Sequence, residues 1–230
     1  MDLNLSATQG MYVETVRRFV KTEILPGLLE VERKHAFPFS VVRRAWELGI
    51  LNLSIPAVIK GFELDALSSA LIIEELAYGD SGIATSAMCN DLANAVIAQH
   101  GIPSQQEAFL RPFVEEPLLA SFCLTEPGAG SDNSAMTTFM VRREDGSYLL
   151  NGTKCFITNA SFASQFTVFC KVGKPAGNFM ACVIVPVPPP ALEAIAGGFP
   201  TGREIFLPAG GCIAVGKPED KLGQRLSGHL

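Results

Sequence analysis

The chain has 230 residues, of which 48% are hydrophobic and 18% charged, and its 21 glycines and 15 prolines follow no repeating period. This composition excludes a disordered chain, a collagen-like repeat and a coiled coil, and it favours one or two domains with hydrophobic cores. The formal net charge of −5, without a stripe of basic residues, argues against a nucleic-acid-binding protein.

Cysteine usage and the N-terminus bear on the compartment. The six cysteines stand at irregular spacings inside apolar stretches, which is typical of reduced, buried thiols. The sequence has neither a signal-peptide pattern nor an apolar run long enough to cross a bilayer. Three histidines far apart, without an H-E-x-x-H motif, predict no metal site. We therefore expect no membrane insertion, and a protein of the bacterial cytoplasm or of the mitochondrial matrix.

The first 116 residues are expected to form an all-helical domain. Amphipathic patterns predict helices over about 8–23, 26–35 and 40–48, and Gly49 is suited to end the third. Asp65 is suited to cap a helix that runs to Tyr78. Because this helix is apolar nearly all round, we expect it to be buried.

Two more helices complete this half. One is expected over about 82–100, ending before Gly101. Ser104 and Glu107 have the S-x-x-E spacing of a capping box, which predicts the start of the last helix.

After Pro117 the hydrophobic period changes from 3.6 to 2, so residues 117–230 are expected to form an antiparallel β-barrel or sandwich domain. The fold class is thus α+β. Strands are expected at about 118–125, 137–142, 148–150, 154–157, 165–172 and 179–187. Asp145-Gly146 and Asn151-Gly152 are typical of hairpin turns, and residues 186–211 are expected to form a long irregular loop.

Two motifs have simpler interpretations than their spelling suggests. Residues 79–82 spell the GDSG of trypsin-like serine proteases, but they join two helices, where Gly79 ends one and Asp80 or Ser81 caps the next. Residues 197–204 imitate a phosphate-binding loop. Arg203 and Glu204 replace the lysine and the hydroxyl residue of that motif, so we expect an ordinary loop.

The segment 124–132, LTEPGAGSD, has two interpretations. It can be a simple turn after a strand. Alternatively, its glycines let backbone N–H groups approach an anionic or heteroaromatic ligand, and Thr125 and Ser131 add hydroxyls. It lacks the third glycine of a dinucleotide-binding fingerprint and follows no βαβ unit, so it is not a Rossmann turn.

Longer runs of sequence resemble a known family. PLLASFCLTEPGAGSD, followed by GSYLLNGTKCFITNA, resembles the acyl-CoA dehydrogenases, and RRAWELGILNLSIP with LIIEELAYGDSG is similar to their medium-chain members. The resemblance covers roughly residues 10–187. It implies a helical domain, a middle β domain and a C-terminal four-helix domain, with FAD between the last two and a fatty acyl-CoA against the flavin. It also implies a homo-oligomer and an electron-transfer flavoprotein as partner.

The same resemblance implies particular site residues. The FAD-binding residues would be Phe122, Leu124, Thr125, Gly128, Ala129, Gly130, Ser131, Phe156, Ile157 and Thr158. Leu124 and Thr125 would contact the pyrimidine edge of the flavin, and the turn 128–131 would reach the phosphates. Ser131 would also contact the acyl-CoA.

The 154–158 segment would complete the flavin contacts. Phe156 would pack on the flavin ring, where many relatives have Trp, and Thr158 would donate a hydrogen bond near flavin N5.

Departures from the family limit what is expected of this chain. Residues 58–61 lack the family's Gly-Gly pair, and the stretch 187–216 is longer than the family's connection. Residues 216–225 match a family segment again, shortly before Leu230. We therefore expect the last β strands of the middle domain and the C-terminal domain, which carries the family's catalytic glutamate, to be absent. Glu74, Glu75 and Glu126 match no such glutamate, so we expect no catalytic residue here.

Three functions stay open from the sequence. The first is a truncated form of an enzyme of fatty acid β-oxidation that carries out flavin-dependent α,β-dehydrogenation of fatty acyl-CoA. The second is a non-catalytic flavin- or acyl-CoA-binding paralogue or partner of a full-length enzyme. The third is an acyl-CoA oxidase, which shares the motifs and differs in oxygen reactivity. The acyl chain length is expected to depend on the helices around residues 74–99.

Overall fold

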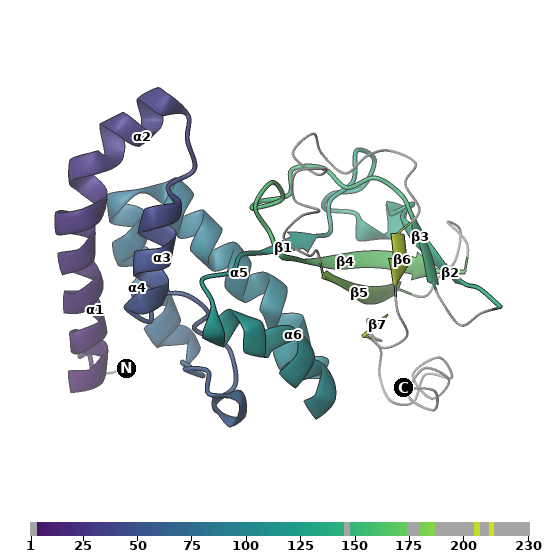
Figure 1. Ribbon diagram of the computed structural model, residues 1–230, viewed down its shortest axis with the longest axis horizontal. Coiled ribbons are helices and arrows are strands. Elements are labelled where there is room, and N and C mark those ends of the chain that lie inside the picture. Colours follow the sequence, from purple (N-terminus) through teal and green to yellow (C-terminus); the bar gives the residue numbers. More distant parts are fainter. Residues whose placement is uncertain (1–3, 145–147, 174–179, 187–204, 208–211, 214–230) are drawn as a thin grey trace.

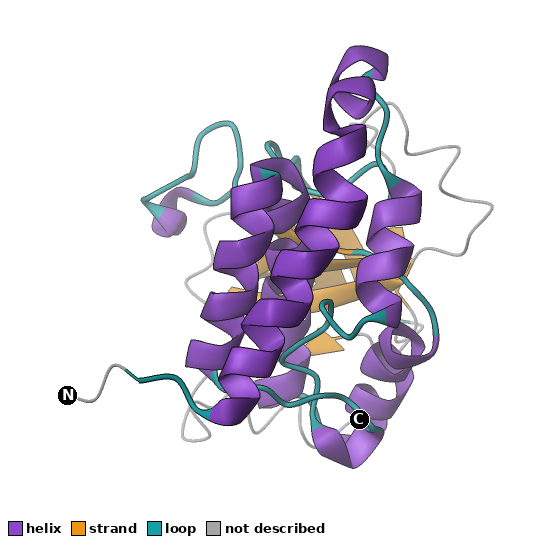
Figure 2. Ribbon diagram, turned by 90° about the vertical axis from the view of Figure 1, so that its left-hand side faces the viewer, coloured by secondary structure: helices purple, strands orange, loops and turns teal. Residues whose placement is uncertain are grey.

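The computed structural model describes residues 4–144, 148–173, 180–186, 205–207 and 212–213. Helices lie on one side of the molecule and a mixed sheet on the other, with strand β1 at their junction (Figure 1). Seen from the helical side, the helices stand in front of the sheet (Figure 2). The α+β class, with a helical part before a sheet part, is confirmed.

Six α-helices are described. They are α1 (Ala7–Phe19), α2 (Leu28–Lys34), α3 (Phe39–Glu47), α4 (Ala66–Gly79), α5 (Ser81–His100) and α6 (Pro103–Glu115). The first expected helix continues past Phe19 as a π-helical turn, Val20–Ile24, in which Leu25 N–H donates to Val20 O. Pro26 has no N–H to continue a regular α-helix, so a 3-10 turn, Leu25–Gly27, follows and a new helix begins.

Two details of the expected helices are wrong. Helix α4 is capped by Asp65, whose Oδ1 accepts from Ser68 N at 2.9 Å, but it is not buried all round. Leu67 is 56% and Tyr78 75% exposed, because α1 and α5 cover only one side of α4. Helix α6 begins at Pro103, and Gln105 Oε1 accepts from Ile102 N at 3.1 Å, so the capping box expected at Ser104 does not form.

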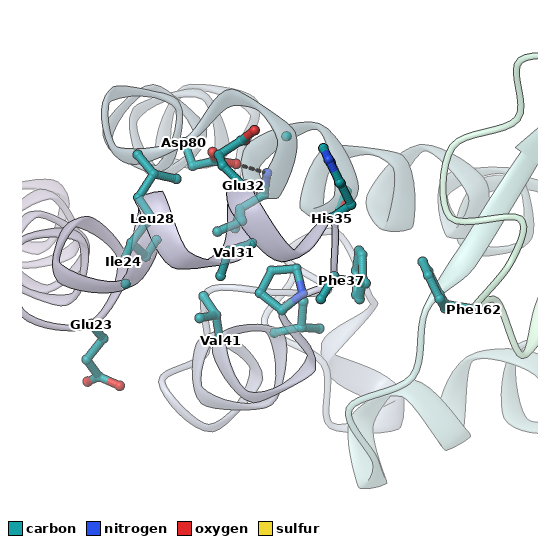
Figure 3. A pocket seen from close by; sticks show the side chains of 17 residues that line it. Glu23, Ile24, Leu28, Val31, Glu32, His35, Phe37, Val41, Asp80 and Phe162 are labelled. Carbon is teal, nitrogen blue, oxygen red and sulfur yellow. Dashed lines mark hydrogen bonds between the residues drawn. The ribbon is translucent and has the colours of Figure 1, made fainter.

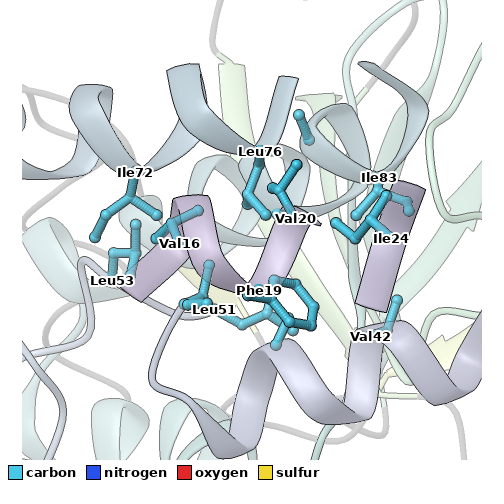
Figure 4. Close-up of a cluster of buried hydrophobic side chains, with 14 of the residues drawn as sticks. Val16, Phe19, Val20, Ile24, Val42, Leu51, Leu53, Ile72, Leu76 and Ile83 are labelled. Carbon is cyan, nitrogen blue, oxygen red and sulfur yellow. The ribbon is translucent and has the colours of Figure 1, made fainter. Parts of the chain in front are cut away.

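The core of the helical part gathers around α1. Val16, Phe19 and Val20 pack between Ile72 and Leu76 of α4 and the segment after α3 (Figure 4). These side chains are at most 2% exposed, and each contributes roughly 1.5–3 kcal/mol by its burial. The core fixes α4, and through α4 the start of α5.

The sheet contains seven strands among the described residues. They are β1 (Ala120–Cys123), β2 (Phe139–Arg142), β3 (Tyr148–Asn151), β4 (Gln165–Val172), β5 (Met180–Pro186), β6 (Ile205–Leu207) and β7 (Cys212–Ile213). Their order is β6-β3-β2-β4-β5-β7, and β1 also pairs with β4. The expected purely antiparallel pairing is corrected here, because β4 runs parallel to β1 and to β2. Long connections make such parallel pairs possible.

Three further β expectations are wrong. Residues 154–157 form no strand, because Phe156 and Asn159 have φ of +55° and +64° and the segment follows the loop after β1 instead. Asn151-Gly152 is therefore no hairpin turn. Strand β6 lies inside the expected loop 186–211, whose remaining parts lie outside the described residues together with Asp145-Gly146.

Helix α5 connects the two parts of the molecule. Asn90, fully buried, donates to Asn52 Oδ1 and Leu118 O at 3.0 Å each, and its own Oδ1 accepts from Ala120 N. Thr167 of β4 donates to Ala93 O at 2.9 Å. Within the part of the chain that the structure describes, no helix combines the length and the apolar character needed to cross a membrane.

Candidate functional site

The two motif segments lie side by side at the C-terminal end of β1. Cys155 N donates to Thr125 O at 3.0 Å, and Lys154 Nζ donates to Leu124 O at 2.8 Å. Further along, Ser121 Oγ donates to Thr158 O at 2.8 Å. The structure thus brings residues 121–131 and 154–158 together, as one site requires.

Glu126 is the buried anchor of this region. Its carboxylate accepts hydrogen bonds from Thr137 N at 2.6 Å, Thr137 Oγ1 at 2.8 Å and Thr138 N at 2.9 Å. Lys154 Nζ lies 2.8 Å from Glu126 Oε1, and the two side chains are only 4% and 2% exposed. Four hydrogen bonds therefore satisfy a carboxylate that would otherwise be costly to bury.

These partners decide the protonation state of Glu126. Burial raises its pKa, but hydrogen bonds from Lys154, Thr138 and Thr137 outweigh burial and lower the pKa to about 2. A carboxylate that stays ionised and fully paired at neutral pH is a poor general base. Glu126 is therefore a structural residue.

The turn after Glu126 presents unpaired donors. Glu126 N donates to Ala129 O at 2.8 Å and Ala129 N to Glu126 O at 3.1 Å, which closes a tight turn with Ala129 buried. Among the described residues, the N–H groups of Gly128, Gly130 and Ser131 donate to no protein acceptor, and all three residues are exposed.

Glycine at positions 128 and 130 is not required by the chain itself. A Cβ built on either residue would meet no atom within 4 Å, and neither residue has a positive φ. The space next to Gly128 and Gly130 is therefore empty, and unpaired N–H groups lie at its edge. This arrangement fits an anionic ligand such as the phosphates of FAD.

The second segment contributes an exposed aromatic ring. Phe156 is 94% exposed, and its φ of +55° is rare for a residue with a bulky side chain. Its neighbour Ile157 is partly buried against the sheet core. Thr158 is held by its main chain, whose carbonyl accepts from Ser121 Oγ and from Cys89 Sγ at 3.8 Å.

Phe122 differs from the other predicted residues. Its ring packs on Phe169 with a centroid distance of 4.9 Å, in the core cluster between the sheet and the helices. Leu124 and Thr125 are partly buried, and each carbonyl accepts a bond from the neighbouring segment. The side chain of Phe122 therefore packs in the core at this end of β1. Thr125 Oγ1, in contrast, has no protein partner among the described residues.

Sequence reasoning missed three residues of this region. Glu126 and Lys154 form the buried pair, and both belong to the two motifs. Asn159 is buried with a φ of +64°, and its Nδ2 donates to Ser86 O at 3.0 Å and Ala120 O at 3.1 Å. The only signal for them was a polar residue inside a motif otherwise interpreted as ligand-binding.

The GDSG segment is a helix junction, as predicted. Asp80 Oδ1 accepts from Ile83 N at 2.7 Å and caps α5. The phosphate-loop imitation at 197–204 lies outside the described residues.

An apolar cavity of about 370 Å³ lies elsewhere, between α2, α3 and the start of α5 (Figure 3). Phe37 and Phe162 stack at one end with ring centroids 4.4 Å apart. The polar residues that line the cavity are Glu23, Glu32, His35, Asp80 and Ser86. None of the ten predicted FAD-binding residues lines it. The motif residues and this cavity are thus separate features.

Helices packed on a mixed sheet, with a turn that presents unpaired N–H donors at the end of β1, define an α+β protein with a candidate anion-binding turn. Two family models match the chain, "Acyl-CoA dehydrogenase, N-terminal domain" over residues 6–117 and "Acyl-CoA dehydrogenase, middle domain" over residues 121–203. The chain belongs to the acyl-CoA dehydrogenase family.

Individual relatives agree with this assignment. The chain is 33% identical over 226 residues to the mitochondrial short-chain specific acyl-CoA dehydrogenase of Homo sapiens, covering 97% of this chain and 49% of that protein. The enzyme of the same name from Rattus norvegicus is 32% identical over 228 residues, covering 98% and 50%. The chain spans about half the length of these relatives. Their names refer to short chains, whereas the helical motifs of this sequence resemble medium-chain members.

Solved structures show the same fold. Butyryl-CoA dehydrogenase from Megasphaera elsdenii superposes with a TM-score of 0.80 at 27% identity, covering 98% of this chain and 63% of that chain. An acyl-CoA dehydrogenase complexed with FAD from Bacillus anthracis superposes with a TM-score of 0.73 at 32% identity, covering 80% and 31%.

Proposed function

We propose that this chain supplies the flavin-binding side of an enzyme that dehydrogenates fatty acyl-CoA thioesters between the α and β carbons. The observation that carries the proposal is the turn 128–131. Its Gly128, Gly130 and Ser131 N–H groups have no protein partner among the described residues, and its glycines leave space that the fold does not need. The FAD in the Bacillus anthracis relative supports FAD as the ligand.

In this proposal each segment has a binding task. Gly128, Gly130 and Ser131 donate to the phosphates of FAD, and Ser131 also contacts the acyl-CoA. Leu124 and Thr125 meet the pyrimidine edge of the flavin.

Phe156 packs on a face of the flavin ring. Its side chain, which is 94% exposed in the chain without ligand, would then be covered by the flavin. Thr158 donates near flavin N5, and bound FAD supplies the acceptor for the β-hydride.

The base that removes the α-proton is proposed to lie outside the described residues. Glu126 is excluded by its ion pair and low pKa. Removal of a general base typically lowers the rate of such a reaction by about 10²–10⁴-fold, so we expect the described residues without that base to support little dehydrogenase activity. An electron-transfer flavoprotein is the proposed electron acceptor, and the solved structures similar to this chain include one described as the electron transferring flavoprotein of Acidaminococcus fermentans.

A non-catalytic role is the second candidate. In that role the chain binds flavin or acyl-CoA through the turn 128–131 and acts on a full-length enzyme. Activity of the chain, alone or mixed with a full-length relative, separates the two candidates.

The test is an FAD titration of the chain and of Gly130→Val, followed by flavin absorbance. The variant should lose FAD binding, because its side chain enters the space reserved for the ligand. Gly10→Val is the matched control, since a Cβ at Gly10 also meets nothing within 4 Å but lies on α1, away from the turn. Equal FAD affinity of the chain and Gly130→Val would refute the proposed site. Acyl-CoA added to the FAD-loaded chain then reports dehydrogenation.

A further inference from the structure

The loop 126–137 leaves the sheet and returns to the same edge of it. Strand β1 pairs with β4 up to Cys123↔Val168, and β2 pairs with β4 from Phe139↔Lys171. The intervening loop therefore begins and ends at neighbouring positions along β4. Compact surface loops of this length with adjacent ends are frequently functional.

A single carboxylate joins the two ends of this loop. Glu126, at the departing end, accepts from the main chain of Thr137 and Thr138 at the returning end, at 2.6 and 2.9 Å. We call these three residues, with Lys154, the neck of the loop, and residues 127–131 its tip. At the tip, Pro127, Gly128, Gly130 and Ser131 are exposed.

Lys154 connects the neck to the second motif segment. Its Nζ donates to Leu124 O and to Glu126 Oε1, at 2.8 Å each. The ammonium thus holds the end of β1, the loop and the residues just before Phe156 in one arrangement.

We propose that the buried Lys154–Glu126 pair is a positioning device that sets the distance between the tip and Phe156 for FAD. A buried ion pair is often no more stabilising than apolar side chains of similar volume, so its particular contribution here is geometric. The inference rests on the proposed function. Both residues act through the loop, and neither is assigned contact with the flavin.

The experiment uses the 230-residue chain and four variants. Glu126→Gln and Lys154→Met each break the pair, and Lys154→Arg keeps the positive charge. Glu75→Gln is the matched control, because Glu75 pairs with Arg17 on the helical surface, away from the loop. FAD affinity is measured by titration, and exchange at the tip is measured in the chain without FAD as the amide hydrogen exchange of Ala129, whose buried N–H donates to Glu126 O.

We expect Glu126→Gln and Lys154→Met to weaken FAD binding about tenfold or more and to accelerate exchange at the tip by a similar factor. Lys154→Arg should restore part of both, and Glu75→Gln should change neither. Exchange in α5 serves as the internal reference, since it reports global stability.

The outcomes separate the two proposals. If the unmodified chain binds no FAD, the proposed function fails, and exchange at the tip still decides the positioning role. Tip exchange that is unchanged in Glu126→Gln, or that accelerates only as much as α5 does, overturns the positioning role. If Lys154→Met does not fold, Glu126→Gln and Lys154→Arg carry the test.

Discussion

The neck and the tip of the loop 126–137 belong to one motif but have opposite relations to the fold. At the neck, Glu126 and Lys154 are buried and all their charges are paired. At the tip, Gly128 and Gly130 are exposed, make no hydrogen bonds to protein through their N–H groups, and could carry a Cβ without a clash. Residues whose identity the fold explains are thus separable from residues whose identity only a ligand explains.

This contrast gives a rule for substitutions. A change at the neck should lower stability, and through position it should also lower FAD affinity. A change at the tip should lower FAD affinity and leave stability unchanged. The following predictions test this division, beginning with the largest effect.

Breaking the neck should be the most costly single change. Lys154→Met leaves Glu126 buried without its cation, and we expect the free energy of unfolding to fall by about 3–5 kcal/mol. Urea denaturation followed by circular dichroism measures this loss. The double variant Lys154→Met with Glu126→Gln removes both charges and should lose less than the sum of the two single changes. Simple additivity would show that the two side chains are not coupled.

The second-largest effect should be a loss of unfolding free energy at acidic pH, when Glu126 becomes protonated. The pKa of Glu126 is lowered from 4.5 to about 2 in the folded chain, so its contribution is fully present above pH 4.5 and is lost as the pH falls toward 2. A shift of this size corresponds to roughly 3 kcal/mol. Unfolding free energies measured across this range should fall more steeply for the unmodified chain than for Glu126→Gln. Parallel curves would contradict the assigned pKa.

Replacement by alanine should lower the stability of the chain at Gly152 but not at Gly130. A Cβ at Gly152 would lie 2.3 Å from Thr138 Oγ1 and 2.6 Å from Thr138 Cα, so Gly152→Ala should cost about 1–3 kcal/mol. A Cβ at Gly130 would meet nothing within 4 Å, so Gly130→Ala should change stability by less than about 0.5 kcal/mol. Thermal unfolding of both variants makes the comparison, and equal losses would show that the tip is packed against the fold as closely as Gly152 is packed against Thr138.

The helix junction 79–82 offers a smaller version of the same contrast. Asp80 caps α5 through Ile83 N, whereas Ser81 is exposed and fills no such role. Asp80→Ala should cost about 1 kcal/mol, the usual value of an N-cap, and Ser81→Ala should be nearly neutral. Chemical denaturation measures both. A large loss in Ser81→Ala would show that the serine has a partner that the capping interpretation omits.

Local signals predicted the fold where one element determines its own ends. Asp65, Asp80 and Gly101 end or begin helices as their residue types suggest, and strands β4 and β5 lie where strands were expected, although both are apolar and buried along most of their length. Residues 154–157 form no strand although one was expected, because Lys154 and Cys155 bond to the end of β1 instead. Contacts between residues about 30 positions apart leave no periodicity in the sequence.

The sequence predicted which motif residues belong to the site. It did not predict which of them hold the fold together and which are left for a ligand. The sequence indicated the glycines of the tip as ligand-binding, because glycine lets backbone N–H groups approach a ligand without a Cβ in the way. The pairing of Glu126 with Lys154 depends on the path of the loop along β4, which single-residue preferences do not report. Burial of Asn159 depends likewise on the packing of α5 against β1.

Thr158 gives the smallest expected effect and the most specific test of the division. Its carbonyl accepts from Ser121 Oγ at 2.8 Å, so its main chain is held by the fold. Its hydroxyl has no protein partner among the described residues, as at the tip. Thr158→Val keeps the shape and the main-chain contact, and it should leave the unfolding free energy nearly unchanged.

Loss of the Thr158 hydroxyl should change the binding and the absorbance of FAD. A neutral hydrogen bond contributes about 0.5–1.5 kcal/mol net, so FAD affinity in Thr158→Val should fall by up to about tenfold. Since the bond is assigned near flavin N5, the absorbance spectrum of bound FAD should also shift. Ser121→Ala is the matched control, because it removes the bond to the Thr158 carbonyl and should lower stability instead. If Thr158→Val binds FAD with the same affinity and spectrum as the unmodified chain, Thr158 belongs with the residues that serve the fold alone.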